Sequence, residues 1–338
     1  MEACDTYMQA VFAILGLAHE ARWNPDARML QPQVRYELGR RMTTSPANTV
    51  TPSEDVTPDA VVQPTEQRGL VAEAKLGLPK DVTTWDRDII QIQKYDDDLA
   101  GWWTASEHIP THDIVVLVPI TRAVKFVDRL TEGLLAGRWE FRRHVSVTGF
   151  FKQSGVKEFV TLKQEWGALS DENLSERLRQ SKSIDIERLF TTYKATFVDS
   201  PPPLPYLLQI IWDNLFTSYA AQFSKEEGEE GKDYVALSLT LAKVAEDLQE
   251  YFGAKSTGPR SPEIPKPSWV RKAFDALVEF KLAERQDDQR YVIRYKRTRS
   301  DTLRKFGRLC FQLEQKQKAR AETTAPFLPG LEPPASQS

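Results

Sequence analysis

The sequence has little cysteine and no long apolar run, and these shortages exclude several classes of protein. Only two of its 338 residues are cysteine, Cys4 and Cys310, at opposite ends of the chain and without the spacing of metal ligands. A disulfide framework is therefore not expected, and a reducing cytoplasm is the expected location. The longest apolar run, residues 10–18, is far shorter than a membrane span. It follows Glu2 and Asp5 rather than a basic segment, so neither membrane insertion nor a signal peptide is predicted.

A strong charge of one sign is also missing. The chain carries 45 Lys and Arg against 48 Asp and Glu, for a formal net charge of -3. Any surface that attracts nucleic acid must therefore be local. A Walker-type phosphate loop, a glycine-rich dinucleotide fingerprint and a nucleophile elbow are all absent. If a motor drives this protein on DNA, we expect that motor to be a separate chain.

The length and the proline distribution predict more than one domain. Successive prolines at 201–203 cannot continue a helix or a central strand, and residues 253–267 form a linker rich in Gly and Pro. The predicted division is a first domain, a helical domain or connector, a small basic module and a disordered tail, at residues 1–170, 171–255, 256–320 and 321–338.

One stretch, residues 58–95, holds the residues that suggest chemistry. Two short apolar runs, around Val61 and over residues 70–76, are separated by a turn-like segment and predict paired strands. Because side chains alternate along a strand, Glu73 and Lys75 are expected on one face. If Asp59 ends the neighbouring strand, two carboxylates and an ammonium converge. Such oxygens suit Mg²⁺, which activates water, and the ammonium would stabilise developing negative charge.

These residues resemble a known family of nucleases. Pro58-Asp59 followed by Glu73-Ala74-Lys75 looks like the signature of the PD-(D/E)XK superfamily, whose fold is restriction-endonuclease-like. Gln91 and Tyr95 look like the QxxxY extension of its RecB-like branch. The resemblance covers roughly residues 30–130. It implies that Asp59, Glu73 and the carbonyl of Ala74 bind the metal, that Lys75 is the catalytic lysine, and that Gln91 and Tyr95 orient substrate or support the site.

A further glutamate is implied by the same resemblance. Many members carry one on the helix before the first strand. Pro32 predicts the start of a helix that extends to about Met42, which makes Glu37 the candidate and Glu20 the alternative.

The same residues also allow an ordinary structural interpretation. A Glu and a Lys two positions apart on a strand often form a solvated pair, and a Tyr four residues after a Gln can belong to an amphipathic helix. The order of the motifs, their apolar flanks and the strand–strand–helix context together favour the nuclease.

The order of elements predicts the fold class. Helices are expected at residues 5–19, 32–42, 86–103 and 121–135, with an apolar strand at 113–119. This alternation predicts an α/β domain with a restriction-endonuclease-like central mixed sheet flanked by helices, followed by a mainly α C-terminal domain. Arg142, Arg143 and His144 lead into another predicted strand, where the basic cluster could contact phosphates or could simply be a solvated strand end. Two amphipathic helices are expected further on, at 204–223 and 233–252.

The C-terminal part resembles a winged helix. A helix from Ser268 leads into a strand, the polar turn 286–289 and a second strand, like a recognition helix and its wing. Residues 281–320 hold 13 Lys or Arg against 5 Asp or Glu, a local basic surface of the kind that contacts phosphates. The alternative is a protein-contact module with a solvated helix. The predicted DNA-binding residues are Arg285, Arg290, Arg294, Lys296, Arg297 and Arg299.

The sequence thus predicts a Mg²⁺-dependent deoxyribonuclease, with Mn²⁺ as a possible substitute and water as the nucleophile. Its expected partners are DNA, a separate motor or other protein subunit, and a second copy of the chain. Such a protein would suit restriction, anti-phage defence, repair or mobile-element processing. Two alternatives stay open, namely a non-catalytic adaptor on a nuclease scaffold and a winged-helix regulator with an unrelated N-terminal domain.

Overall fold

The computed structural model divides the chain into two compact units. The N-terminal unit comprises residues 2–202 and 245–269, and the C-terminal unit comprises 203–244 and 270–338. The residues that the structure describes are 2–21, 30–31, 36–38, 55–56, 58–65, 67–76, 82–100, 111–193, 197, 201–219, 222, 224–227, 233–252, 264–296, 305–313, 315–316 and 319. Each unit is described by itself.

A seven-stranded sheet forms the centre of the N-terminal unit. Its strands lie in the spatial order β1 (Leu30–Gln31), β4 (Ala60–Thr65), β5 (Arg68–Ala74), β7 (Thr111–Pro119), β8 (Val145–Gln153), β9 (Phe159–Gly167) and β10 (Ser183–Asp185). β5, β7 and β8 run parallel to one another, and the remaining pairs are antiparallel. The sheet is therefore mixed, as predicted.

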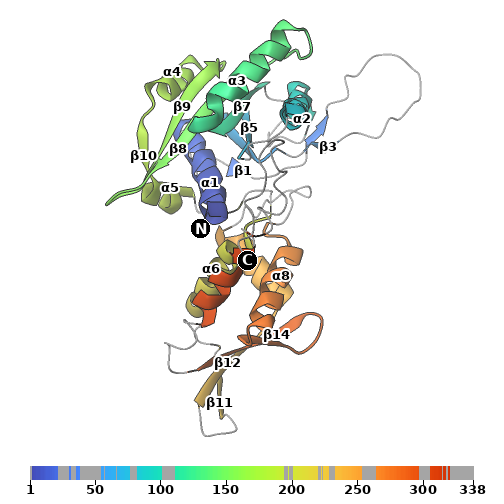
Figure 1. The fold of residues 1–338 in the computed structure, drawn as a ribbon, viewed down its shortest axis with the longest axis vertical. Helices are drawn as coiled ribbons and strands as arrows, with labels where there is room; N and C mark the ends of the chain where they lie inside the picture. Colours follow the sequence, from blue (N-terminus) through green and yellow to red (C-terminus); the bar gives the residue numbers. More distant parts are fainter. Residues whose placement is uncertain are drawn as a thin grey trace, which may run out of the picture. The chain divides into compact units, whose positions relative to one another are not determined.

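Helices cover both faces of this sheet (Figure 1). They are α1 (Glu2–Glu20), α2 (Val82–Gln93), α3 (Ile120–Leu135), α4 (Glu172–Gln180) and α5 (Ile186–Tyr193). On one face, Ile114 and Val116 of β7 join a buried cluster with residues of α2 and α3. On the other face α1 packs closely, because a Cβ built on Gly16 would lie 3.3 Å from Leu162 of β9. The α/β architecture with a flanked mixed sheet is confirmed.

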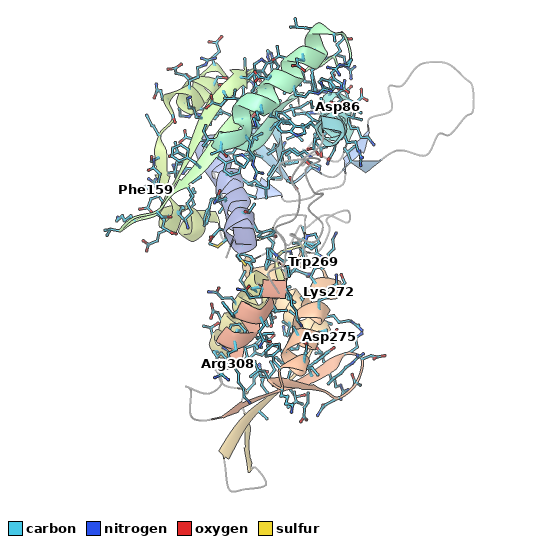
Figure 2. The ribbon with its side chains drawn as sticks, viewed as in Figure 1. Asp86, Phe159, Trp269, Lys272, Asp275 and Arg308 are labelled. Atoms are coloured by element: carbon cyan, nitrogen blue, oxygen red, sulfur yellow. The ribbon has the colours of Figure 1, made fainter. Side chains whose placement is uncertain are left out.

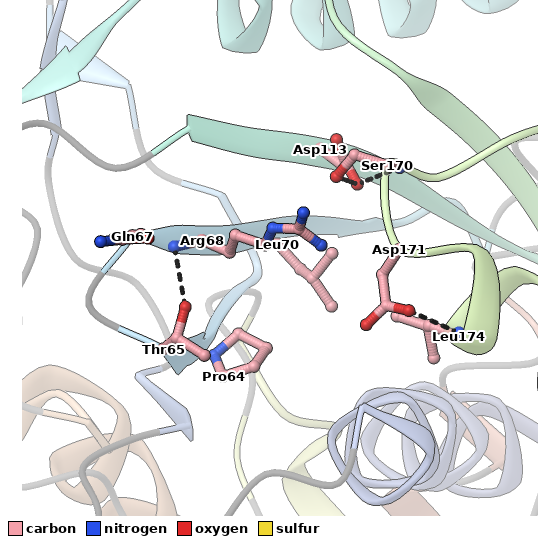
Figure 3. A pocket seen from close by; sticks show the side chains of 10 residues that line it. Pro64, Thr65, Gln67, Arg68, Leu70, Asp113, Ser170, Asp171 and Leu174 are labelled. Atoms are coloured by element: carbon pink, nitrogen blue, oxygen red, sulfur yellow. Dashed lines mark hydrogen bonds between the residues drawn. The ribbon is translucent and has the colours of Figure 1, made fainter.

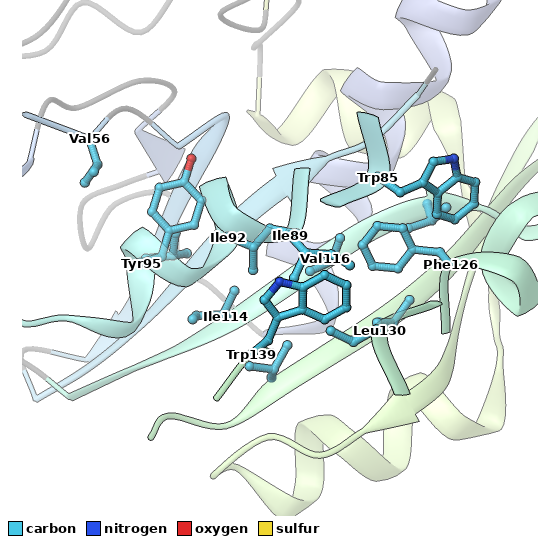
Figure 4. Close-up of a cluster of buried hydrophobic side chains, with 14 of the residues drawn as sticks. Val56, Trp85, Ile89, Ile92, Tyr95, Ile114, Val116, Phe126, Leu130 and Trp139 are labelled. Atoms are coloured by element: carbon cyan, nitrogen blue, oxygen red, sulfur yellow. The ribbon is translucent and has the colours of Figure 1, made fainter. Parts of the chain in front are cut away.

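The buried cluster on the α2 and α3 face fixes where α2 lies (Figure 4). The rings of Trp85 on α2 and Phe126 on α3 have centroids 5.6 Å apart. Beside them, Arg129 of α3 donates to both carboxylate oxygens of Asp86, at 2.9 and 2.8 Å. Paired nitrogen–oxygen bonds of this kind fix direction as well as distance. α2 is thus held in one orientation over the carboxyl end of β5.

A second, three-stranded sheet corrects two predicted helices. It has the order β3 (Asp55–Val56), β2 (Tyr36–Leu38) and β6 (Leu99–Ala100). The helix predicted over 32–42 is wrong at 36–38, where pairing with β3 and β6 overrides the local helix signal. The helix predicted over 86–103 ends earlier. α2 stops at Gln93, a 3-10 turn, η2 (Lys94–Asp96), follows, and β6 begins at Leu99.

The N-terminal unit reaches past residue 170, where we expected its domain to end. β10 pairs with β9 as the edge strand of the main sheet, and α4 packs against β9. The division between the units falls instead between Pro202 and Pro203, inside the run of prolines.

The C-terminal unit is built on a small antiparallel sheet. Its sheet order is β11 (Ser224–Glu227), β12 (Asp233–Thr240), β14 (Arg290–Lys296) and β13 (Ala283–Arg285). The chain also forms α6 (Leu204–Ser218), α7 (Leu241–Phe252), α8 (Pro267–Glu279) and a helical segment at 305–313. The helix predicted over 233–252 is wrong in its first half. There Leu237 and Leu239 are buried and Ser238 is exposed, which is the period of a strand.

Aromatic residues hold α8 against the hairpin of β13 and β14. The rings of Phe274 and Tyr291 have centroids 5.0 Å apart, and the Tyr291 hydroxyl donates to Oδ1 of Asp275 at 3.0 Å. Asp275 is labelled on α8 in Figure 2. Within the described ranges of the chain, none of the helices combines the length and the apolar character needed to cross a membrane.

One glycine of the N-terminal unit offers a direct test of its packing. A Cβ at Gly133 of α3 would lie 1.8 Å from the buried ring of Trp139. Because the ring is packed within the buried cluster and must shift to admit the added methyl group, we expect Gly133→Ala to lower the free energy of unfolding by about 1–3 kcal/mol in urea titrations. The matched control is Gly155→Ala, whose Cβ would meet nothing closer than 3.6 Å, and which should change that free energy by about 0.5 kcal/mol or less. Equal stability of the two variants would contradict this packing.

Candidate functional site

The predicted carboxylates and the predicted lysine lie together at one end of β5. Asp59 directly precedes β4, which pairs antiparallel with β5 so that Ala60 faces Ala72. Its Oδ2 accepts a hydrogen bond of 2.8 Å from the backbone N–H of Ala74. The start of one strand is thereby tied to the end of the next. Asp59 therefore lies beside the Glu73–Lys75 segment, as the sequence predicted, although it precedes its strand rather than ending it.

Glu73 of β5 and Lys75, the residue that follows Ala74 at the end of β5, point the same way, as their alternation predicted. The Nζ of Lys75 lies 2.7 Å from Oε1 of Glu73. This is not a solvated surface pair, because the two side chains are only 13% and 6% exposed. The backbone of Lys75 is fixed as well, since its N–H donates to the carbonyl of Leu117 on β7 at 2.8 Å.

Gln91 and Tyr95 complete the cluster from α2 and η2. Gln91 donates through Nε2 to Oε1 of Glu73 at 2.9 Å and accepts from Nζ of Lys75 at 2.8 Å. The Tyr95 hydroxyl donates to Oε2 of Glu73 at 2.8 Å. Their spacing of four places both side chains on the side of the helical segment that faces β5. Both oxygens of the Glu73 carboxylate therefore accept hydrogen bonds from protein donors.

Three further residues support the cluster, and two of them, Asp88 and Arg122, were missed in the sequence, whereas His112 was expected in a loop or in a supporting position near a strand. Asp88 of α2 lies 3.6 Å from Nζ of Lys75, and Arg122 of α3 donates to the carbonyl of Leu76. Nε2 of His112 donates to the carbonyl of Tyr95 at 2.7 Å. Asp88 could have been found, because it precedes Gln91 by three positions on the same helical face. The contact of Arg122 joins distant segments and left no local signal.

Burial and charge act on the titrating groups of this site. Burial alone lowers the pKa of Lys75, but the negative charges of Glu73, Asp88 and Asp59 outweigh it and raise that pKa above its usual value. Burial, followed by the Glu73 charge, raises the pKa of the Tyr95 hydroxyl well above its usual range. At neutral pH Lys75 is therefore a cation and Tyr95 is a neutral donor.

Neither candidate for the extra glutamate is placed in the cluster. Glu37 lies in β2 rather than on a helix, so that part of the prediction is wrong, and its side chain lies outside the described residues. Glu20 ends α1, where its backbone carbonyl accepts from Nε of Arg177 at 2.9 Å and its carboxylate lies 3.6 Å from the same atom. The Glu20 carboxylate thus serves the packing of α4 on α1.

The basic pair at 142 and 143 has a structural partner. The carboxylate of Asp96 accepts from the backbone N–H groups of Arg142 and Arg143 at 2.8–2.9 Å. The two guanidinium groups also pair with Asp97 and Asp98. These arginines therefore anchor the η2 turn, on which Tyr95 lies.

The donor set fits a hard divalent cation in type. The part of the chain that the structure describes contains no group of three or more His, Cys, Asp or Glu able to hold a metal. A cation here would depend on Asp59, Glu73 and the carbonyl of Ala74, which are all oxygen ligands of the kind that Mg²⁺ and Mn²⁺ accept. It would also have to share Glu73 with the donors already bound to that carboxylate.

Two of the predicted DNA-binding arginines lie in the hairpin of β13 and β14. Arg285 pairs with Asp288, and Arg290 lies 3.6 Å from Asp287, both within the turn. The backbones of Arg294 and Lys296 belong to β14, but their side chains lie outside the described residues, as do all atoms of Arg297 and Arg299.

Comparison with family models, with curated proteins and with solved structures finds no match for this chain.

His112 provides a pH test of how the site is held together. Burial lowers the pKa of His112 to about 4 from its ordinary 6.5, so the folded protein keeps the ring neutral. Because the unfolded chain binds the proton first, stability should fall as pH drops from 6.5 towards 4, by about 3 kcal/mol in all. Urea unfolding at several pH values, compared between the wild type and His112→Gln, isolates this contribution.

The exposed His144 is the matched control, since His144→Gln should keep the pH dependence of the wild type. NMR titration of the imidazole resonances reports the His112 pKa directly. A ring at position 112 that titrates near 6.5 would show that it is not buried as described.

Proposed function

We propose that this chain is a metal-dependent deoxyribonuclease of the PD-(D/E)XK type that hydrolyses phosphodiester bonds. The observation that carries the proposal is the bonded cluster of Asp59, Glu73, Lys75, Gln91 and Tyr95 at the carboxyl end of β5. Five residues of the suggested motifs, spread over 37 positions of sequence, meet within hydrogen-bond distance of one another or of β5. An accidental Glu–Lys surface pair would not be expected to recruit both Gln91 and Tyr95.

In this proposal, three oxygen ligands of the cluster hold the metal ion. Asp59, Glu73 and the carbonyl of Ala74 would hold Mg²⁺, or Mn²⁺ in its place. When bound, that cation supplies Lewis-acid activation of a water and neutralises charge on the phosphate.

Lys75 acts as a fixed positive charge in this proposal rather than as a base. Its neighbours raise its pKa, so it holds its proton at neutral pH and cannot accept one from water. A cation that is already in place stabilises negative charge as it develops on the phosphate, without reorganisation during the reaction. Gln91 and Tyr95 keep Lys75 and Glu73 in position, since each bonds to that pair from α2 or η2.

The C-terminal unit is proposed to contact DNA as a winged-helix-like module. α8 is followed by β13, a polar turn and β14, which is the helix–strand–turn–strand order on which the resemblance rests. The side chains of Arg285 and Arg290 are 42% and 64% exposed, and each pairs with an aspartate of its own turn. Exposed ion pairs contribute little, so a DNA phosphate can replace the aspartate as partner.

One observation favours a second candidate function, a non-catalytic adaptor on the same scaffold. Both oxygens of Glu73 already accept bonds from Lys75, Gln91 and Tyr95, so the cluster is satisfied by protein donors alone. A buried network of this kind also serves purely to fix a fold. Calorimetric titration separates the two functions, because the nuclease requires Mg²⁺ or Mn²⁺ to bind and Asp59→Asn to weaken that binding, whereas the adaptor requires neither.

Removing the lysine tests the catalytic proposal. Lys75→Ala should lower the rate of DNA cleavage by at least about 100-fold, because the fixed charge next to the phosphate is removed. Asp59→Asn should do the same while keeping an oxygen that can accept from the N–H of Ala74. The measurement is cleavage of linear, circular and single-stranded DNA, with and without Mg²⁺, beside circular dichroism to confirm folding.

Matched controls come from exposed residues of α3. Lys125→Ala and Asp128→Asn remove the same charges from the surface and should keep the full rate. Full activity of a folded Lys75→Ala protein would refute the assignment.

Charge removal in the hairpin tests DNA contact separately from cleavage. Replacing Arg285 and Arg290 together by Ala should weaken DNA binding and reduce the slope of log K against log salt by about 1 for each phosphate that the hairpin no longer neutralises. Lys163→Ala on β9 removes an exposed charge from the other unit and serves as the control. Fluorescence anisotropy over a salt series measures the slope, and an unchanged slope in the double variant would exclude DNA binding by these arginines.

A further inference from the structure

A cavity lies at the opposite end of β5 from the Glu73 cluster. It has a volume of about 500 Å³ and is lined by residues of the β4–β5 turn, of β7 and of the start of α4 (Figure 3). Arg68 begins β5 and Ala74 ends it, so six residues at about 3.3 Å each separate the cavity from the Glu73 site by roughly 20 Å. The cavity size is that of a small-molecule site.

A buried carboxylate with a spare oxygen faces this cavity. Asp113 of β7 is only 3% exposed and forms part of the cavity wall. Its Oδ2 accepts two hydrogen bonds from Ser170, at 2.8 Å from the backbone N–H and 2.7 Å from the hydroxyl. Its Oδ1 has no partner among the residues that the structure describes. It is not one of the described side-chain atoms that are buried without a partner, so Oδ1 is accessible from the cavity, where the donor of a ligand can reach it.

Two more charged groups line the same space. Asp171 uses Oδ1 to accept from the N–H of Leu174 at 3.0 Å, which leaves its Oδ2 without a partner in the described part of the chain. Arg68 donates through its backbone to Thr65, while its exposed guanidinium has no partner among the described residues. Figure 3 shows Arg68, Asp113 and Asp171 around one space, with Leu70 and Leu174 beside them.

These groups select a ligand by the direction of its hydrogen bonds. Carboxylate oxygens only accept and a guanidinium only donates, so the ligand needs two N–H donors on one edge and acceptors on another. Guanine presents N1–H and its amino group on one edge, and O6 and N7 on the other, where arginine is its commonest partner. Adenine and cytosine place a ring-nitrogen acceptor beside a single amino donor, and that lone pair would face a carboxylate. Leu70 and Leu174 supply apolar surface for the planar ring.

We propose that this cavity binds a guanine base, either of a free nucleotide or of an unpaired residue in a nucleic-acid strand. Asp113 and Asp171 accept from the Watson–Crick edge, and Arg68 donates to O6 and N7. The proposal does not depend on the nuclease assignment, because none of its residues belongs to the cluster at the other end of β5.

Calorimetry on the full chain tests the assignment with GMP and AMP as probes. GMP should bind at least about tenfold more tightly than AMP. Arg68→Ala should weaken GMP binding by about tenfold or more, and it removes an exposed side chain, so folding is not at risk. Asp113→Asn should weaken it similarly, because its amide oxygen can keep accepting from Ser170 while an NH₂ group replaces the free oxygen. Arg87→Ala, an exposed arginine of α2, should leave GMP binding unchanged.

Short oligonucleotides distinguish the two sources of the base. An oligothymidine with one central guanine that binds more tightly than both GMP and an all-thymidine strand of the same length assigns the site to a strand, whereas tighter binding of GMP assigns it to a free nucleotide. Equal affinity for GMP and AMP, absence of binding by both GMP and the guanine-containing strand, or GMP binding that survives Arg68→Ala and Asp113→Asn would each overturn the proposal.

Discussion

The Glu73 carboxylate is the group on which the N-terminal unit depends most. It is almost fully buried, and a buried charge is tolerated only when paired and hydrogen-bonded. Its donors come from Lys75 directly after β5, from α2 and from η2, so the carboxylate is satisfied only if these segments keep one relative position. The apolar packing of Trp85 on Phe126 brings α2 to the sheet. The carboxylate then decides the register, because a shift of one helical position would remove Gln91 from its reach.

The η2 turn shows how that position is maintained from the other side. Tyr95 reaches Glu73 with its hydroxyl, while the carbonyl of the same residue accepts from the buried ring of His112. The carboxylate of the next residue, Asp96, accepts hydrogen bonds from the backbone N–H groups of Arg142 and Arg143. Neighbouring residues of one short turn are thus tied to β5, to β7 and to the segment before β8. A turn bonded on three sides is a rigid support, which is what a site that needs fixed side chains requires.

The sequence predicted the parts of this arrangement that have a local pattern. Side-chain alternation in a strand predicts that Glu73 and Lys75 point the same way, and the spacing of four residues predicts that Gln91 and Tyr95 do so too. Both patterns can be recognised in the sequence because the strand and helix periods are short. Asp88 obeys the same spacing but was overlooked in favour of the motif residues. The segments 36–38 and 233–240 were assigned as helix, although both are strands whose partners lie far away in the sequence. The helix or strand propensity of the residues does not determine the conformation of such segments, because pairing with distant strands does. The cavity lined by the β4–β5 turn, β7 and the start of α4 left no pattern in the sequence, because its lining comes from three separate parts of the chain.

The charges of the cluster explain how one carboxylate can serve both the fold and a cation. Asp59, Glu73 and Asp88 are formally negative, and Lys75 is the positive side chain among them, so the cluster carries a formal charge of about -2 at neutral pH. The hydrogen bonds satisfy the geometry of Glu73 without neutralising this surplus. A divalent cation would neutralise this surplus negative charge. If Glu73 also coordinated that cation, Lys75 would still lie near the carboxylates of Asp59 and Asp88. The site is therefore rigid without a metal and still electrostatically prepared for one.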